Sequence, residues 1–372
     1  MQAVSDRPST AEKLARVATL AAASVALIAW VAVGTVYPTG LVSVESDPLS
    51  GVRTGAFPGS PEGVRLLHWS RGHRAVSLTK LAELDVPTGP EALAMLPGGR
   101  LLVCCSRAQV AALVDTAKLK VVGQIPTGGG PVACCTTKDG QMAWLAAAGA
   151  NQVVAVDLGA GKAVAVAACG KSPEAIAATL DGRRVLAANW GSGDVTVIDA
   201  GRAEPIGTVA VGPHPRGIVC TPAGPYAYVS LSGSDKLVKL NWREMRVEGS
   251  ITCGRAPRHL VQSADGDTLF VAQNTPSQIA KVDRDGALVR STCFLSKGQP
   301  RTILIGPNGT DLFVSNSSAG QVTIVDTDRM SESATAQTDV MPDGLALSED
   351  GRRLYVSHSA VSSLWVFEVK YE

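Results

Sequence analysis

Short apolar runs separated by turn residues recur from about residue 75 to the end of the chain. Each unit contains four runs of strand length, and a Gly-containing turn such as Asp181-Gly182 often follows the first. The third run ends in Asp, Asn or Glu, which we interpret as a turn cap. One proline opens each unit, at intervals of 41 to 43 residues: Pro90, Pro131, Pro173, Pro215, Pro257, Pro300 and Pro342.

Four short strands in a repeat of about 42 residues are typical of a β-propeller blade. A single four-stranded sheet cannot bury both of its faces, whereas blades stacked around an axis can. A solenoid of helical pairs has a similar repeat length, but the short runs and frequent Gly turns favour strands. We therefore predict an all-β fold, a seven-bladed β-propeller, over residues 75–372.

The two ends of the repeat region complement each other. The last unit begins at Pro342 and is long enough for only three strands. Residues 80–86 (KLAELDV) precede Pro90 by the same offset as residues 205–211 precede Pro215. We predict that this N-terminal strand completes the last blade, which closes the ring and removes an exposed sheet edge.

A separate pattern precedes the repeats. Residues 17–36 (VATLAAASVALIAWVAVGTV) carry no charge, and a helix of that length spans about 30 Å, the thickness of a bilayer core. Arg7, Lys13 and Arg16 precede this run, so residues 1–16 are predicted to be cytoplasmic and the propeller periplasmic or extracellular. A cleaved signal peptide is the main alternative to a transmembrane anchor, and a buried core helix is a weaker one. Residues 37–74, rich in Pro, Gly and Ser towards their start, are predicted to be a flexible linker.

Three segments resemble the repeats of the YVTN/YncE-type β-propeller family: YAYVSLSGSDKLVKLN, LFVSNSSAGQVTIVDT and DGRRLYVSHS. The resemblance covers residues 75–372. It implies a surface or periplasmic binding protein, with an architecture similar to that of lactonase-like enzymes and amine dehydrogenase heavy chains. The family has no single catalytic motif to place on this sequence, so the resemblance implies the fold more than the function.

The residue after each repeat proline begins the innermost strand of its blade, so these residues are predicted to surround the axial mouth. They are Glu91, Val132, Glu174, Arg216, Arg258, Arg301 and Asp343. Three consecutive blades thus contribute Arg, with acidic residues on both sides. Ends of second strands and nearby loops are expected to add further residues to this rim: His214, His259, His358, Asn189, Asn316 and Trp190.

Guanidinium groups offer forked donors to carboxylates and phosphates, so the ring of arginines predicts a small anionic ligand or a protein partner. The alternative is that the arginines pair with Glu174, Asp343 and Glu91 and only balance charge. No metal is expected, because three arginines oppose a cation, and the sequence has no haem-attachment or other cofactor motif. The net charge of +1 gives no field that would attract nucleic acid.

These patterns favour a membrane-tethered binding or assembly module over an enzyme. A lactonase-like hydrolase with its site at the axial mouth remains an alternative, because a histidine there could act as a base. An accessory subunit of a periplasmic dehydrogenase is a second alternative.

Eight cysteines are spread over the repeats without any CxxC motif. Most occupy positions that small apolar residues fill in other units; Cys104, for example, aligns with Ala187 and Val229. Neighbouring residues on a strand point to opposite faces, so the doublets 104–105 and 134–135 are not expected to bridge internally. One disulfide between strands stays open as an alternative to buried thiols.

Overall fold

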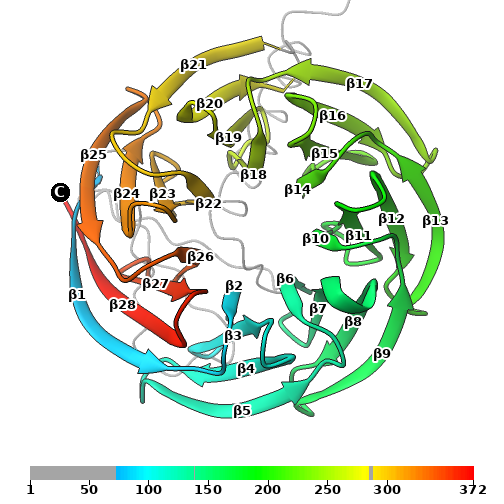
Figure 1. Cartoon of the computed structure of the whole chain (residues 1–372), viewed down its shortest axis with the longest axis horizontal. Helices are drawn as coiled ribbons and strands as arrows, with labels where there is room; N and C mark the ends of the chain where they lie inside the picture. The colour runs from blue at the N-terminus through cyan, green and yellow to red at the C-terminus, as the bar shows by residue number, and fades with distance from the viewer. Residues whose placement is uncertain (1–72, 138, 285–287) are drawn as a thin grey trace, which may run out of the picture.

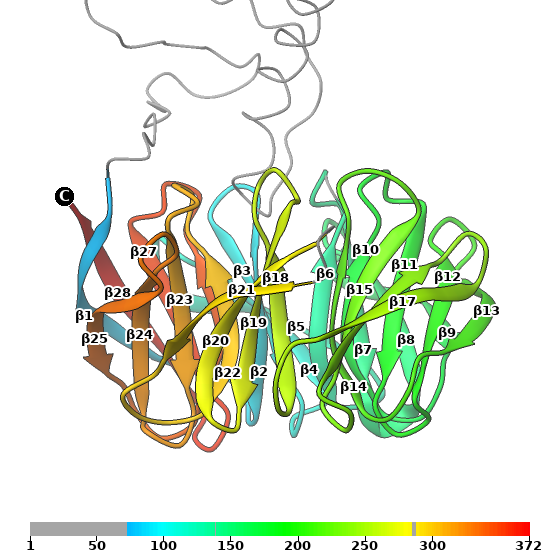
Figure 2. The same ribbon diagram turned by 90° about the horizontal axis from the view of Figure 1, so that it is seen from above.

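The computed structural model describes residues 73–137, 139–284 and 288–372. Seven four-stranded antiparallel sheets surround a central axis in this part of the chain (Figure 1). Seen from the side, the sheets stand next to one another in a short, broad cylinder (Figure 2). The predicted all-β, seven-bladed propeller is therefore confirmed.

Blades are numbered here from the repeat proline that opens each one. Blade 1 contains β2 (Pro90–Leu96), β3 (Arg100–Cys105), β4 (Val110–Asp115) and β5 (Lys120–Pro126). Blade 2 contains β6 (Pro131–Thr136), β7 (Met142–Ala147), the 3-10 turn η1 (Ala148–Ala150), β8 (Gln152–Asp157) and β9 (Lys162–Ala168). Blade 3 contains β10 (Pro173–Ala178), β11 (Arg184–Asn189), β12 (Asp194–Asp199) and β13 (Glu204–Ala210). Blade 4 contains β14 (Pro215–Cys220), β15 (Tyr226–Leu231), β16 (Lys236–Asn241) and β17 (Arg246–Thr252).

The remaining three blades follow the same order. Blade 5 contains β18 (Pro257–Gln262), β19 (Thr268–Asn274), β20 (Ser277–Asp283) and β21 (Leu288–Phe294). Blade 6 contains β22 (Pro300–Ile305), β23 (Asp311–Asn316), β24 (Gln321–Asp326) and β25 (Ser331–Gln337). Blade 7 contains β26 (Pro342–Leu347), β27 (Arg353–His358), β28 (Ser363–Tyr371) and β1 (Ala75–Asp85).

The first strand of each blade lies nearest the axis and the last lies at the periphery (Figure 1). Second and third strands are buried on both faces, as in β11 and β12 of blade 3, whereas the outer strand β13 is mostly exposed. Seven hydrophobic clusters fill the seven interfaces between neighbouring blades. Between blades 3 and 4, for instance, Leu186 and Val195 share a cluster with Val229 and Leu240. The core is thus divided among the interfaces, because each sheet buries its faces only against its neighbours.

The ring closes through its two ends. Strand β1 pairs antiparallel with β28 from Ala75 opposite Tyr371 to Asp85 opposite Ser363, so the predicted closing strand is confirmed. It begins five residues before the predicted residue 80. Arg74 continues the pairing, since its backbone nitrogen and oxygen bond to Glu372 at 2.8 and 2.9 Å. The last residue of the predicted linker therefore joins the sheet.

The predicted cytoplasmic segment 1–16 and membrane segment 17–36 lie outside the described residues, as do residues 37–72 of the predicted linker. Within the described ranges, no helix is long and apolar enough to cross a bilayer. The tether therefore stays a prediction from the sequence.

The side chain that ends the third strand caps the turn after it. In blade 3, the Asp199 carboxylate accepts hydrogen bonds from the backbone nitrogens of Gly201 and Arg202 at 3.0 and 3.1 Å. The same double contact occurs in four further blades, at Asp115, Asp157, Asn241 and Asp326. The predicted role of this recurring residue as a turn cap is confirmed there.

Blade 1 differs in register from the other blades. Pro90 pairs with Cys105, 15 residues later, whereas Pro173 pairs with Asn189, 16 residues later. The hairpin between β2 and β3 is one residue shorter, and this moves the second strand by one position. Cys104 therefore matches Ser230 rather than Val229, and the alignment expected from the sequence was wrong for this strand.

Candidate anion-binding cavity on the propeller axis

A cavity of about 260 Å³ lies where the first strands of all seven blades converge. All seven residues that follow the repeat prolines line it: Glu91, Val132, Glu174, Arg216, Arg258, Arg301 and Asp343. The structure therefore brings together the ring of residues that the repeat alignment predicted.

A break in strand pairing helps to turn these side chains towards the axis. In blade 3, the register between β10 and β11 shifts between Pro173 and Ala175, so Glu174 has no residue directly opposite it. A shift at the same place occurs in the other six first strands. Bulges of this kind re-aim a side chain, and proline favours them because it donates no ladder hydrogen bond.

Serines on neighbouring blades fix the backbone of the cavity wall. Ser315 and Ser357 donate hydrogen bonds to the backbone oxygens of Asp343 and Glu91 at 2.7 and 2.5 Å. Ser230 donates in the same way to the backbone oxygen of Arg258. Each serine comes from the second strand of the preceding blade, so blade stacking itself holds the charged residues in place.

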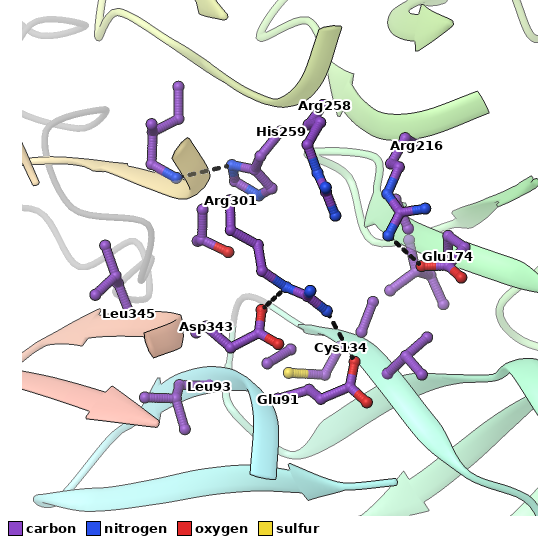
Figure 3. Close-up of a pocket in the computed structure, with 18 of the residues that line it drawn as sticks. Glu91, Leu93, Cys134, Glu174, Arg216, Arg258, His259, Arg301, Asp343 and Leu345 are labelled. Atoms are coloured by element: carbon purple, nitrogen blue, oxygen red, sulfur yellow. Dashed lines mark hydrogen bonds and ion pairs between the residues drawn. The ribbon is translucent and has the colours of Figure 1, made fainter. Parts of the chain in front are cut away.

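Two of the three arginines pair with acidic residues (Figure 3). Arg301 contacts Asp343 with its Nε at 2.5 Å and Glu91 with its Nη2 at 3.8 Å. Arg216 contacts Glu174 at 3.6 Å. These two guanidinium groups therefore match the alternative in which the arginines pair with acidic residues and balance charge.

Arg258 is different. It forms no ion pair within the described part of the chain, and Figure 3 shows it between the two paired arginines. The amide of Asn274 is best oriented with its nitrogen donating to Pro300 O and its oxygen accepting from Arg258 Nη1, both at 2.9 Å. Burial and the neighbouring Arg216 and Arg301 lower the pKa of Arg258 to about 10. The side chain is therefore cationic at neutral pH, and the charges of Asp343 and Glu174 compensate it only partly.

Glu91 is the acidic residue of the cavity whose charged form the surroundings disfavour. Its Oε1 accepts a 2.6 Å hydrogen bond from the Ser106 hydroxyl. Burial, reinforced by the charges of Asp343 and Glu174, raises the pKa of Glu91 to about 7, although Ser106 and Arg301 oppose the shift. At neutral pH this carboxyl is about half protonated, and the cavity then holds three guanidinium groups against fewer than three full negative charges.

Two further polar atoms belong to the cavity. Asp343 is buried and its Oδ2 has no hydrogen-bond partner among the described residues. His259 lies at the wall, where its Nδ1 accepts a weak 3.4 Å hydrogen bond from Ile303 N. Burial lowers the pKa of His259 to about 4, so its ring is neutral at pH 7.

Three of the predicted rim residues do not line the cavity. Asn189 and Asn316 are fully buried within their blades, and their amide nitrogens donate to Thr196 and Thr323 at 2.9 and 2.8 Å. His358 is also fully buried, with its Nδ1 3.4 Å from a serine hydroxyl. These positions at the ends of second strands hold each blade together.

The predicted residues Trp190 and His214 also lie away from the cavity lining. Their rings stack on each other with centroids 4.5 Å apart, where a loop of blade 3 meets a loop of blade 4. His214 is exposed and Trp190 is half-buried. This pair belongs to the loop surface.

Sequence reasoning missed the groups that support the ring. Asn274 satisfies Arg258 from the end of a hairpin, and no repeat pattern marks it. The serines could have been identified as contacts between blades, because the dipeptide Val-Ser recurs in YVSL, FVSN and YVSH.

Known proteins share this architecture. The chain is similar in fold to hydrazine synthase. The solved chain, from Kuenenia stuttgartiensis, superposes with a TM-score of 0.71 and 22% sequence identity, covering 77% of this chain and 97% of that one. No protein-family profile and no curated protein sequence matches the chain. The comparison therefore shows the fold, and the resemblance to YVTN/YncE-type repeats stays a prediction.

Proposed function

We propose that this protein is a binding module that captures a small monoanion, such as a monocarboxylate, in its axial cavity. The observation that carries the proposal is Arg258, a half-buried cation that forms no ion pair with any described residue, although its two neighbouring arginines are both paired. A carboxylate placed against Arg258 would supply the missing charge and accept from its forked donors.

The size and charge of the cavity limit the ligand. Its volume of about 260 Å³ is below the range of roughly 300–1,000 Å³ usual for drug-sized ligands, which favours a small metabolite. With Glu91 protonated, three guanidinium groups face only two carboxylates, so one negative charge restores neutrality. A dianion would bring an excess charge next to Asp343 and Glu174. The unpartnered Oδ2 of Asp343 favours a ligand that also carries a hydrogen-bond donor.

We further propose that residues 17–36 tether this module to a membrane and place it on the periplasmic or extracellular side. The support comes from the uncharged run of 20 residues and from the basic residues that precede it. Alkaline carbonate extraction of cell membranes tests the tether, since a cleaved signal peptide would release the propeller into the soluble fraction.

Titration calorimetry of the full-length protein in mild detergent tests the ligand proposal. The panel comprises acetate, lactate, succinate and inorganic phosphate. We expect a monocarboxylate to bind, and Arg258→Gln to weaken it by about 10- to 150-fold, the value of a charged hydrogen bond. Arg255→Gln is the matched control, because Arg255 lies three residues earlier on the exposed loop and outside the cavity lining. The proposal fails if no anion binds or if Arg258→Gln binds as tightly as the wild type.

A lactonase-like hydrolase is a second candidate, favoured by one observation. Glu91 has a pKa of about 7 inside the cavity, and a general base works best when its pKa lies near the operating pH. The test is hydrolysis of small lactones followed by pH-stat. Activity that Glu91→Gln abolishes would favour catalysis, whereas binding of the carboxylate product without turnover would favour the binding module.

A further inference from the structure

Two cysteines from different blades meet at the cavity wall. Cys104 lies in β3 of blade 1 and is fully buried, and Cys134 lies in β6 of blade 2 and lines the cavity. Cys134 packs against the hydrophobic cluster between the two blades, and Cys104 is part of that cluster. Of the two, Cys134 is the sulfur that a molecule in the cavity can reach.

The shorter hairpin of blade 1 creates this contact. Ser230, Ser315 and Ser357 occupy the matching position in their blades, and each reaches the first strand of the next blade. The one-residue shift in β3 puts Cys104 in this position. It therefore points at the first strand of blade 2, where the side chain that it meets is another cysteine.

The other cysteines are arranged differently. The thiol of Cys105 donates to Val103 O at 3.6 Å. Those of Cys169, Cys253 and Cys293 donate to backbone oxygens at 3.5 to 3.8 Å. All eight cysteines lie in the described part of the chain as free thiols, and Cys104 and Cys134 are the two from different blades that pack in one hydrophobic cluster.

We propose that Cys104 and Cys134 form a reversible disulfide that joins blades 1 and 2 beside the cavity, with a small peroxide as the oxidant. Strands β3 and β6 approach within 8 Å between Cα atoms, close to the separation of about 4.4–6.8 Å that a disulfide requires. The bond requires the blade interface to hold the two Cα atoms within that range.

The reaction proceeds in two balanced steps. The Cys134 sulfur attacks one peroxide oxygen, the O–O bond breaks, and a sulfenic acid and water form. The Cys104 sulfur then displaces the sulfenic oxygen, which leaves as a second water with the two remaining thiol and hydroxyl protons. Two thiols lose two electrons in total, and one peroxide gains them. Cys134 lines the cavity, whereas Cys104 is fully buried, so Cys134 is the sulfur that the peroxide reaches and oxidises first.

The disulfide would tie together residues 30 positions apart, so it would restrict the unfolded chain. For a loop of this length, the expected rise in the melting temperature is about 5 °C. A reductant reverses the rise, because it regenerates both thiols.

Mass spectrometry of the full-length protein treated with hydrogen peroxide tests the proposal. We expect one disulfide that dithiothreitol reverses and that links the tryptic peptides LLVCCSR and VVGQIPTGGGPVACCTTK. Each peptide holds a cysteine doublet, so variants assign the bond. Cys104→Ser should abolish it and still fold, since serine fills this position in three other blades. The matched double variant Cys105→Ser, Cys135→Ser should retain it.

Three results would overturn the proposal: wild-type protein in which no disulfide forms, a bond that persists in Cys104→Ser, or a bond lost in the Cys105 and Cys135 double variant. A peroxide-treated protein that carries only sulfinic acid on Cys134 would also overturn it, because Cys104 would then not have resolved the intermediate.

Discussion

Two positions recur in the blades and follow opposite rules. The residue that ends the third strand has the same short polar chemistry and makes the same two backbone contacts in five blades. The residue after the repeat proline is Glu, Val, Arg or Asp, and its ion-pair partners, where it has them, come from other blades. The first position is satisfied within its own turn and maintains the fold. The second depends on the whole ring, and it is the position at which the proposed ligand would bind.

The largest predicted effect is a difference in stability between variants of two arginines that follow a repeat proline, Arg301 and Arg258. Arg301→Gln leaves the buried Asp343 and the half-buried Glu91 without their cation, so the free energy of unfolding should fall by about 3 kcal/mol. Arg258→Gln removes a charge that Arg216 and Arg301 repel, so stability should stay the same or rise by up to about 1 kcal/mol.

Urea unfolding followed by intrinsic Trp fluorescence measures both variants. Equal destabilisation by the two substitutions would contradict the description of Arg258 as a partly compensated member of the ring. The same experiment controls the binding test, because a stable Arg258→Gln protein cannot lose its ligand through misfolding.

A pH dependence is the next effect in size. The pKa of Glu91 is raised from 4.5 to about 7 in the folded protein, so its contribution to stability is fully present below about pH 4.5 and is lost as the pH rises through 7. Wild-type protein should therefore lose about 2 kcal/mol relative to Glu91→Gln between pH 5 and pH 8. Parallel stability curves of the two proteins over this range would show that burial does not perturb Glu91.

Substitutions at the residue that ends the third strand should change stability least. Asp157→Ala removes an acceptor for the backbone nitrogens of Gly159 and Ala160, and should cost about 1 kcal/mol. Asp157→Asn should change stability little, since Asn241 fills the same role in blade 4. Chemical denaturation midpoints of the two variants measure the difference. If the Ala and Asn variants lose the same stability, the charge of Asp157 stabilises the turn, and its role as a hydrogen-bond acceptor does not.

Most of the fold was predictable because it depends on local patterns that repeat. The prolines and turns revealed seven units, and the incomplete last unit revealed the closing strand. The register of β3 was not predictable in this way. One missing residue in a hairpin moved Cys104 by one position, and the apolar pattern of LLVCC fits either register equally well.

The candidate site was predictable as a ring of positions but not as a set of interactions. Strand order was enough to gather the post-proline residues around the axis. Which arginine would remain unpaired depends on side-chain reach across a ring of seven different residues. It also depends on Asn274, which ends the next strand of the same blade as Arg258. His358 shows that strand position alone can also mislead. Its place at the end of a strand predicted a rim residue, but the packing of blade 7 buries it.

The pairing of β1 with β28 has a consequence for the order of folding. Ala75 and Tyr371 are 296 residues apart, and at about 5–20 residues per second a ribosome needs roughly 15 to 60 s to make that stretch. Throughout that time the first strand to be synthesised has no partner, while six blades can already assemble in sequence. The nascent chain therefore carries an unprotected hydrogen-bonding edge until β28 has been made, and this interval is when a chaperone would protect it best.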